Sequence, residues 1–166
     1  MASNVTDADL PHLRRCVELA EEAVAAGDFP FGSLLVAADG RVLAEDRNRE
    51  VTEGDPTRHP EFALARWAAL NMLPRERAEA TVYTSGEHCP MCAAAHGWAG
   101  LGRIVFATSS EQMTGWLAEL GIGPAPVRPL AITEVVPGLA VAGPAPELAD
   151  QVRALHRRFR AAQQPS

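Results

Sequence analysis

The sequence lacks any uninterrupted apolar run of about 18 residues or more, so no transmembrane helix is expected. It also lacks a secretory signal. Its opening residues, MASNVTDADLPHLRR, have neither the basic start nor the apolar stretch of a signal peptide. We therefore expect a cytoplasmic protein that makes no use of a membrane.

An excess of positive charge is lacking as well. The chain has no lysine, and its 15 arginines face 21 acidic residues, which gives a net charge of −6. A general nucleic-acid binder carries a basic footprint that neutralises phosphates. The charge therefore argues against nucleic acid as the partner, although it does not exclude a local basic patch.

Cysteine is scarce, with only Cys16, Cys89 and Cys92 in the chain. An odd count in which two residues form a C-x-x-C pair makes a poor disulfide framework. The pair is more typical of a metal or redox site. Cys16 falls on the apolar side of an expected helix, and we expect an inert buried thiol there.

The length and composition predict one globular domain over residues 1–166. Apolar residues make up 47% and charged residues 22%, with a mean hydropathy of −0.06. These values are enough for a sizeable core.

Apolar periodicity and turn residues predict helices alternating with strands. The expected helices cover residues 10–26, 60–72, 90–98, 111–120 and 146–162. The expected strands cover residues 33–37, 41–44, 81–85, 103–107 and 130–136. Asp39-Gly40 marks a hairpin between the first two strands, and residues 45–58 read as a long polar loop. This pattern predicts a mixed sheet with helices on both faces.

Two short motifs carry the chemistry: His59-x-Glu61, and Cys89 and Cys92 with two residues between them. Both motifs fall at expected helix starts, where free N–H groups lower thiolate pKa values and favour metal binding. One His and two Cys suit Zn²⁺ and leave a fourth position for water, as in catalytic sites. Glu61 is close enough to exchange a proton with that water.

A non-catalytic structural zinc module is the alternative from another class of protein. It needs a fourth protein ligand, for which His88 or His96 would be the candidates, and it has no use for Glu61.

Four stretches, FPFG at 29–32, DRN at 46–48, DPTRHPE at 55–61 and SGEHCPMC at 85–92, resemble the zinc-dependent cytidine deaminase-like superfamily. The resemblance is strongest to small bacterial guanine and cytosine deaminases. It implies a three-layer α/β/α sandwich around a five-stranded mixed sheet, one Zn²⁺ per chain, and dimers or higher oligomers. It assigns His59, Cys89 and Cys92 as zinc ligands and Glu61 as the catalytic proton shuttle.

The resemblance also implies substrate-binding residues. Asn48 matches an amide that reads the base edge, Phe31 lines the pocket, and Trp98 matches an aromatic residue near the base. A later acid contacts the substrate in guanine deaminases, and Glu111 and Glu119 are the candidates here.

Two residues depart from the family pattern. Pro60 stands between the motif His and Glu, and a first helical turn tolerates proline. His88 stands where the family has proline before the first Cys. We expect it to be a pocket wall or a solvent-facing side chain, because joint ligation with adjacent Cys89 would be strained.

The sequence therefore predicts a zinc-dependent aminohydrolase that releases ammonia from a free nucleobase. Guanine and cytosine are the leading substrates, and aminotriazines are related candidates. The alternative enzyme is a tRNA adenosine deaminase, because the last helix resembles that branch in being rich in arginine. Those arginines are Arg153, Arg157, Arg158 and Arg160. A solvated basic face is the simpler interpretation of them.

Overall fold

The structure is a computed structural model that describes residues 4–164. One sheet contains five strands in the order β2-β1-β3-β4-β5. These strands are β1 (Gly32–Val36), β2 (Val42–Arg47), β3 (Thr81–Gly86), β4 (Ile104–Thr108) and β5 (Val141–Ala142). The β1 strand is antiparallel to β2 and β3, whereas β3, β4 and β5 run parallel. The predicted mixed sheet is confirmed.

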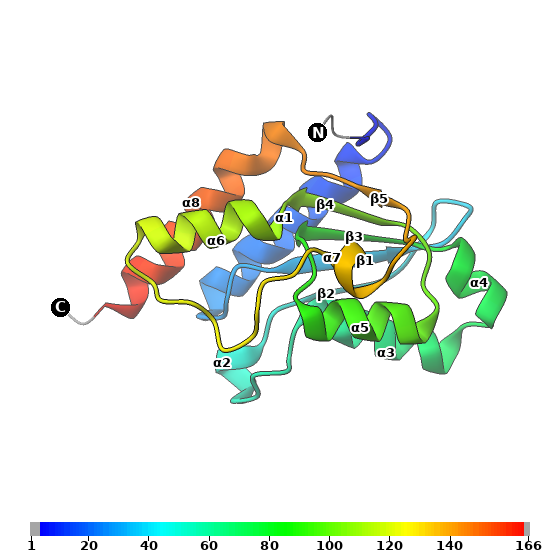
Figure 1. Cartoon of the computed structure of the whole chain (residues 1–166), viewed down its shortest axis with the longest axis horizontal. Helices are drawn as coiled ribbons and strands as arrows, with labels where there is room; N and C mark the ends of the chain where they lie inside the picture. The colour runs from blue at the N-terminus through cyan, green and yellow to red at the C-terminus, as the bar shows by residue number, and fades with distance from the viewer. Residues whose placement is uncertain (1–3, 165–166) are drawn as a thin grey trace.

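Helices cover both faces of this sheet, as Figure 1 shows. They are α1 (Leu10–Ala26), α2 (Glu50–Glu53), α3 (Pro60–Asn71), α4 (Pro74–Glu79), α5 (Pro90–Ala99), α6 (Ser110–Glu119), α7 (Ile132–Val135) and α8 (Pro146–Gln163). The α1 and α8 helices pack on one face, and α3 and α5 pack on the other. The three-layer sandwich is therefore confirmed.

Alternation along β1 explains how one strand serves two cores. Leu34 and Val36 point into the core with α1 and α8, whereas Leu35 points into the core with α3. All five residues of β1 are buried, which is expected of a strand covered on both faces. The hairpin to β2 is confirmed at Gly40, whose φ of +87° matches the positive φ that such turns need.

The strand predicted at residues 130–136 is wrong, because this segment contains the short helix α7. Ile132, Val135 and Val136 follow a helical spacing and all face the cluster around α5 and β4. Glu134 accepts a hydrogen bond from the Ala131 amide at 2.8 Å, which caps the helix start. The last strand comes later and has two residues, Val141 and Ala142.

Two further helices were missed. The polar loop predicted at residues 45–58 starts as the end of β2 and then forms α2. Pro74, expected only to end a helix, begins α4, since proline fits the first turn. Local patterns of four and six residues are too short to predict such helices.

Glu87 ties the loop after β3 to two helix starts. One of its carboxylate oxygens accepts a hydrogen bond from the Ser110 amide at 2.9 Å, and the other accepts one from the Ile132 amide at 2.8 Å. The side chain is 8% exposed. The segment from α6 to α7 is thereby fastened at both ends to the loop that carries Cys89.

Within residues 4–164, the structure contains no helix with the length and apolar character needed to cross a membrane.

Candidate metal centre and active site

Three potential metal ligands converge at the starts of α3 and α5. His59 is the N-cap residue of α3, Cys89 is the N-cap residue of α5, and Cys92 lies in the first turn of α5. The two helices pack against each other, which brings their N-terminal ends together. His59 Nδ1 lies 3.5 Å from Cys89 Sγ and 3.4 Å from Cys92 Sγ, and the sulfur atoms are 3.6 Å apart.

These separations fit a zinc ion. Typical Zn–S and Zn–N bonds in a tetrahedral site place ligand atoms about 3.5–3.8 Å from one another. In the described part of the chain, His59, Cys89 and Cys92 are the group of His, Cys, Asp and Glu that fits a metal, and all ligand atoms lie within 4.8 Å of one another. Neither His88 nor His96 belongs to this group, which disfavours a closed structural zinc site.

Hydrogen bonds among the ligands shift the pKa values of Cys89 and His59 in opposite directions. A hydrogen bond from Cys92, assisted by His59, lowers the pKa of the Cys89 thiol to about 4 although burial opposes this. Burial also opposes a charge on His59, but its contacts with Cys89 and Glu50 raise the pKa of His59 to about 10. Without a metal, the imidazolium thus balances the thiolate, and metal binding must displace the proton.

Glu61 lies in the first turn of α3 beside the metal ligands. Its Oε2 atom is 3.7 Å from Cys92 Sγ, and its Oε1 atom accepts hydrogen bonds from Ser33 Oγ at 3.1 Å and Thr84 Oγ1 at 2.9 Å. The side chain is 5% exposed, and this burial raises its pKa. A carboxyl group with a raised pKa is suited to taking up and releasing a proton.

Ser33 and Thr84, which hold Glu61, were not predicted from the sequence. They form a cross-strand pair between β1 and β3, and Ser33 Oγ lies 2.9 Å from Thr84 Oγ1. Both are fully buried on the face that Leu35 and Val82 make apolar. Two hydroxyls on an otherwise apolar strand face are the signal that could have identified them.

Glu50, at the start of α2, was also missed. Its Oε1 atom lies 3.1 Å from His59 Nε2, and it accepts a hydrogen bond from Asn48 Nδ2 at 2.7 Å. Asn48 is fully buried, and its predicted role in reading the base stays a prediction. Nothing local identifies Glu50, because its contact with His59 spans nine residues and depends on how α2 is placed.

The two aromatic candidates occupy different surroundings. Phe31 packs edge-on to His156 at 5.4 Å between ring centroids, and it lies over Gly86 at the end of β3. Trp98 is 92% exposed in the last turn of α5. That turn is about 9 Å along the helix axis from Cys92. Phe31 thus lies at the end of β3, from which the chain continues to Cys89. Trp98, by contrast, is not packed against the metal ligands of its own chain.

The two candidate acids, Glu111 and Glu119, differ in their position on α6 and in whether they form an ion pair. Glu111 is exposed in the first turn of α6, which directly follows β4. Glu119 lies at the other end of α6 and forms an ion pair with Arg153. The structure therefore leaves Glu111 nearer the sheet edge that carries the site, and a substrate contact by either acid stays a prediction.

His88 is 1% exposed, so the solvent-facing alternative is wrong. Its ring lies edge-on to His96 at 5.3 Å between centroids, and burial lowers its pKa well below the usual value. His96 is anchored by a 2.8 Å contact between its Nε2 atom and the Gly102 carbonyl oxygen, which supports a structural role. Both rings are buried, and His88 directly precedes the ligand Cys89 in the chain.

Residues 6–108 match the family described as the cytidine and deoxycytidylate deaminase zinc-binding region. The match includes all three metal ligands and Glu61.

Curated relatives act on different substrates. The chain is 31% identical over 112 residues to a probable cytosine deaminase of Schizosaccharomyces pombe, and the alignment covers 68% of this chain and 67% of that protein. It is 40% identical over 96 residues to a guanine deaminase of Bacillus subtilis, covering 57% and 61%. It is 34% identical over 103 residues to a tRNA-specific adenosine deaminase of Haemophilus influenzae, covering 62% and 59%. The matches thus span about three fifths to two thirds of each relative.

A solved structure of a guanine deaminase from Nitrosomonas europaea superposes with a TM-score of 0.71 at 24% identity. It covers 96% of this chain and 88% of that one. At this identity, the superposition establishes a shared fold.

Proposed function

Because the chain belongs to the cytidine and deoxycytidylate deaminase zinc-binding family, we propose that this zinc-dependent hydrolytic deaminase acts on a free nucleobase, guanine or cytosine. The observation that carries the proposal is the position of Glu61. Its buried carboxyl lies beside three metal ligands that leave a fourth position open.

The reaction replaces an exocyclic amino group by a carbonyl oxygen. Zinc, when bound by His59, Cys89 and Cys92, lowers the pKa of a water to roughly 7. Glu61 takes a proton from the attacking water and delivers it to the ring nitrogen. Glu61 then takes the second proton of the water from the oxygen that has added to the ring carbon, and it transfers this proton to the amino group. The C–N bond breaks, ammonia leaves, and the oxygen becomes the carbonyl. Two buried hydroxyls, those of Ser33 and Thr84, keep the Glu61 carboxyl in place throughout.

Binding of the planar base falls to the side chains that surround the site. The Asn48 amide offers a donor and an acceptor to a base edge, and Phe31 offers an aromatic wall. We assign these roles as part of the same proposal.

A tRNA adenosine deaminase is the second candidate, because a tRNA-specific relative is about as similar as the base-specific relatives. The arginines of α8 give it limited support. Arg153 pairs with Glu119, Arg158 pairs with Glu21 at 3.3 Å, and Arg160 stacks on Phe29 at 5.4 Å. Three of the four basic side chains that could contact phosphates are thus engaged within the fold.

Ammonia release distinguishes the candidates. Zinc-loaded protein is incubated with guanine, cytosine, adenine, their nucleosides and a tRNA transcript, with Glu61→Gln as the inactive control. We expect ammonia from guanine or cytosine alone. Inosine in the tRNA, with every free base left intact, would instead establish the second candidate.

We also propose that a second copy of the chain covers α3 and α5. The α5 helix has no charged residue, and Trp98 is 92% exposed on it. On α3, Leu70 is 72% exposed and Trp67 is 36% exposed. A helix that is apolar all round, as α5 is, is normally buried, so its exposed side calls for a partner, and a self-complementary surface pairs with itself in a two-fold dimer.

Light scattering after size-exclusion chromatography tests this dimer. We expect the protein to be a dimer and Trp98→Glu to be a folded monomer. Val127→Glu is the control, because Val127 is also exposed, at 51%, but lies in the segment after α6. A monomeric wild-type protein would overturn the proposal.

A further inference from the structure

We propose that Glu50 is a positioning residue that sets the metal ligand His59 and the base-reading candidate Asn48 at the same time. One carboxylate oxygen, Glu50 Oε1, contacts both side chains. The part that concerns Asn48 rests on the proposed function. The part that concerns His59 rests only on the metal centre.

The contact with His59 fixes the direction of its ring. Nδ1 faces the two cysteine sulfurs, and Nε2 faces Glu50 Oε1 at 3.1 Å. A carboxylate accepts a hydrogen bond, so Nε2 carries the hydrogen and Nδ1 keeps its lone pair for a metal. Carboxylates that hold a ligating histidine in this way orient the ring and make it a better ligand.

The contact with Asn48 fixes its amide from two sides. The backbone N–H of Glu50 donates to Asn48 Oδ1 at 3.0 Å, and Asn48 Nδ2 donates to Glu50 Oε1 at 2.7 Å. One amide hydrogen and one oxygen lone pair of Asn48 remain for a ligand. A base edge that presents an acceptor beside a donor matches this remaining pair.

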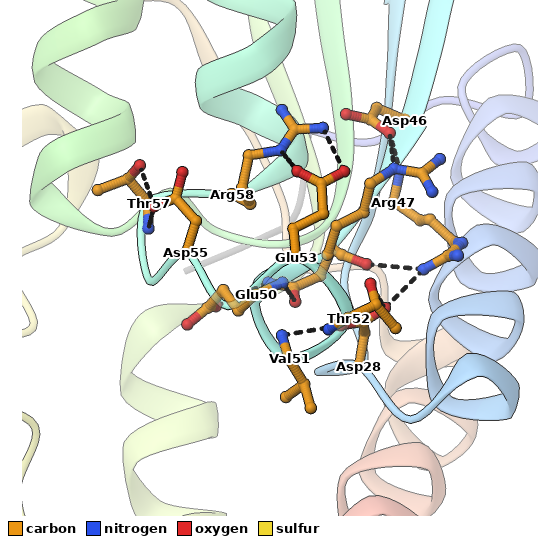
Figure 2. Close-up of polar contacts among 12 residues, drawn as sticks. Asp28, Asp46, Arg47, Glu50, Val51, Thr52, Glu53, Asp55, Thr57 and Arg58 are labelled. Carbon is orange, nitrogen blue, oxygen red and sulfur yellow. Dashed lines mark hydrogen bonds and ion pairs between the residues drawn. The ribbon is translucent and has the colours of Figure 1, made fainter.

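Glu50 itself is placed by a buried carboxylate from another part of the chain. Asp28, between α1 and β1, is fully buried and accepts hydrogen bonds from the amides of Val51 and Thr52, both at 2.9 Å. It also accepts bonds from the Thr52 hydroxyl at 2.8 Å and from Arg47 at 2.9 Å (Figure 2). A helix of four residues does not hold its own shape in water. The Asp28 cap therefore determines where α2, and with it Glu50, stands.

The same short helix provides a matched control. Glu53 lies one turn after Glu50, and its carboxylate binds the Arg58 guanidinium at 2.5 Å and 3.3 Å (Figure 2). Among residues 4–164, the hydrogen bonds of the Glu53 side chain go to Arg58, which is not a metal ligand. Substituting Glu53 therefore changes the charge of α2 without touching His59 or Asn48.

Zinc affinity, measured by competition with a chromophoric chelator, is the first test. We expect Glu50→Ala to bind zinc roughly 10–100-fold more weakly than the wild-type protein. Glu50→Gln keeps an acceptor oxygen but loses the charge, so we expect a smaller loss of about threefold or more. Glu53→Gln should bind zinc like the wild-type protein. Wild-type affinity in both Glu50 variants would overturn the proposal, and Glu50→Gln alone decides the matter if the alanine variant does not fold.

Nitrogen NMR of the zinc-loaded protein separates positioning from a general structural role. We expect His59 to carry its hydrogen on Nε2 in the wild-type and Glu53→Gln proteins. In Glu50→Ala, the Nε2–H signal should shift and exchange faster with water. An unchanged His59 signal in Glu50→Ala would contradict the assigned role, whatever the variant does to stability.

Steady-state kinetics test the Asn48 part. With a base that the wild-type protein deaminates, Glu50→Ala at saturating zinc should raise KM more than it lowers kcat, because the Asn48 amide is no longer fixed. An unchanged KM overturns this part. If no base is a substrate, the proposed function fails, while the zinc and NMR results still decide the role of Glu50 toward His59.

Discussion

Thr84 Oγ1, on the central strand β3, lies 2.9 Å from Glu61 Oε1, at the start of α3. The carboxyl next to the metal ligands is thus fixed to the rigid sheet as well as to its own helix. Glu61 Oε2 remains on the side of Cys92, where a reacting water and base would meet the metal. This division leaves one oxygen for positioning and the other for proton transfer.

Glu61→Gln should lower kcat by about 10²–10⁴-fold, because glutamine keeps the size of the side chain but cannot carry the proton. Zinc content, measured by elemental analysis, should stay at the wild-type level. Turnover near the wild-type rate would remove Glu61 from the mechanism.

Thr84→Val serves as the companion variant, since valine keeps the shape and removes the hydroxyl. It leaves the Glu61 proton carrier present but less well fixed, so its loss in kcat should be smaller than that of Glu61→Gln.

Cys89→Ala should abolish stoichiometric zinc binding, because two ligands do not replace three. It should also lose the stabilisation that zinc gives the wild-type protein in thermal unfolding. Cys16→Ala is the matched control from the same chain, since Cys16 is fully buried on α1 and far from the metal ligands in sequence. Cys16→Ala should keep its zinc, and a Cys89→Ala protein that does so too would contradict the ligand assignment.

Stability should fall as the pH drops from about 6.5 to about 4, in part because of His156. Burial, assisted by the charge of Arg160, lowers the pKa of His156 to about 4. Between pH 6.5 and 4, the His156 side chain therefore stays neutral in the folded protein but takes up a proton in the unfolded chain. At about 1.4 kcal/mol per pKa unit, the free energy of unfolding loses up to about 3 kcal/mol over this range. Urea denaturation of wild-type and His156→Phe proteins at both pH values measures the difference. An equal loss in the two proteins would refute this contribution.

The salt dependence of kcat/KM should be nearly flat between roughly 50 and 200 mM, because a neutral base displaces few counterions. The double variant Arg157→Ala, Arg158→Ala should keep its activity on free bases. Arg160 is left intact, since it stacks on Phe29 and Phe159 and its removal would cost packing. A steep fall with salt, together with loss of activity in the double variant, would indicate a phosphate-rich substrate.

The metal ligands could be predicted because their signal is local. His59 and Glu61 are two residues apart, Cys89 and Cys92 are three apart, and helix starts follow from the residues around them. Packing α3 against α5 then brings the two motifs together without any further information.

Glu50 and α7 could not be predicted for a different reason. The α2 helix that carries Glu50 depends on a cap from Asp28, which is distant in sequence. The α7 helix depends on Glu87, which binds the amide of Ile132 from 45 residues away. The local helix or strand propensity of a segment does not predict such long-range contacts. The exposure of Trp98 was equally hidden, because an apolar helix such as α5 reads as fully buried.

The two hydrogen bonds of Glu87 have a consequence for how this protein can vary. The amides of Ser110 and Ile132 are held by one carboxylate, so the chain between them leaves and returns at a single point. Segments whose ends are fixed close together tolerate changes in length, because the rest of the fold does not have to follow them. The residues between α6 and α7, 120–131, should therefore tolerate changes in length that leave Cys89 in place. The α6 helix itself is less free to change, because Trp116 packs against the core shared by α1 and α8.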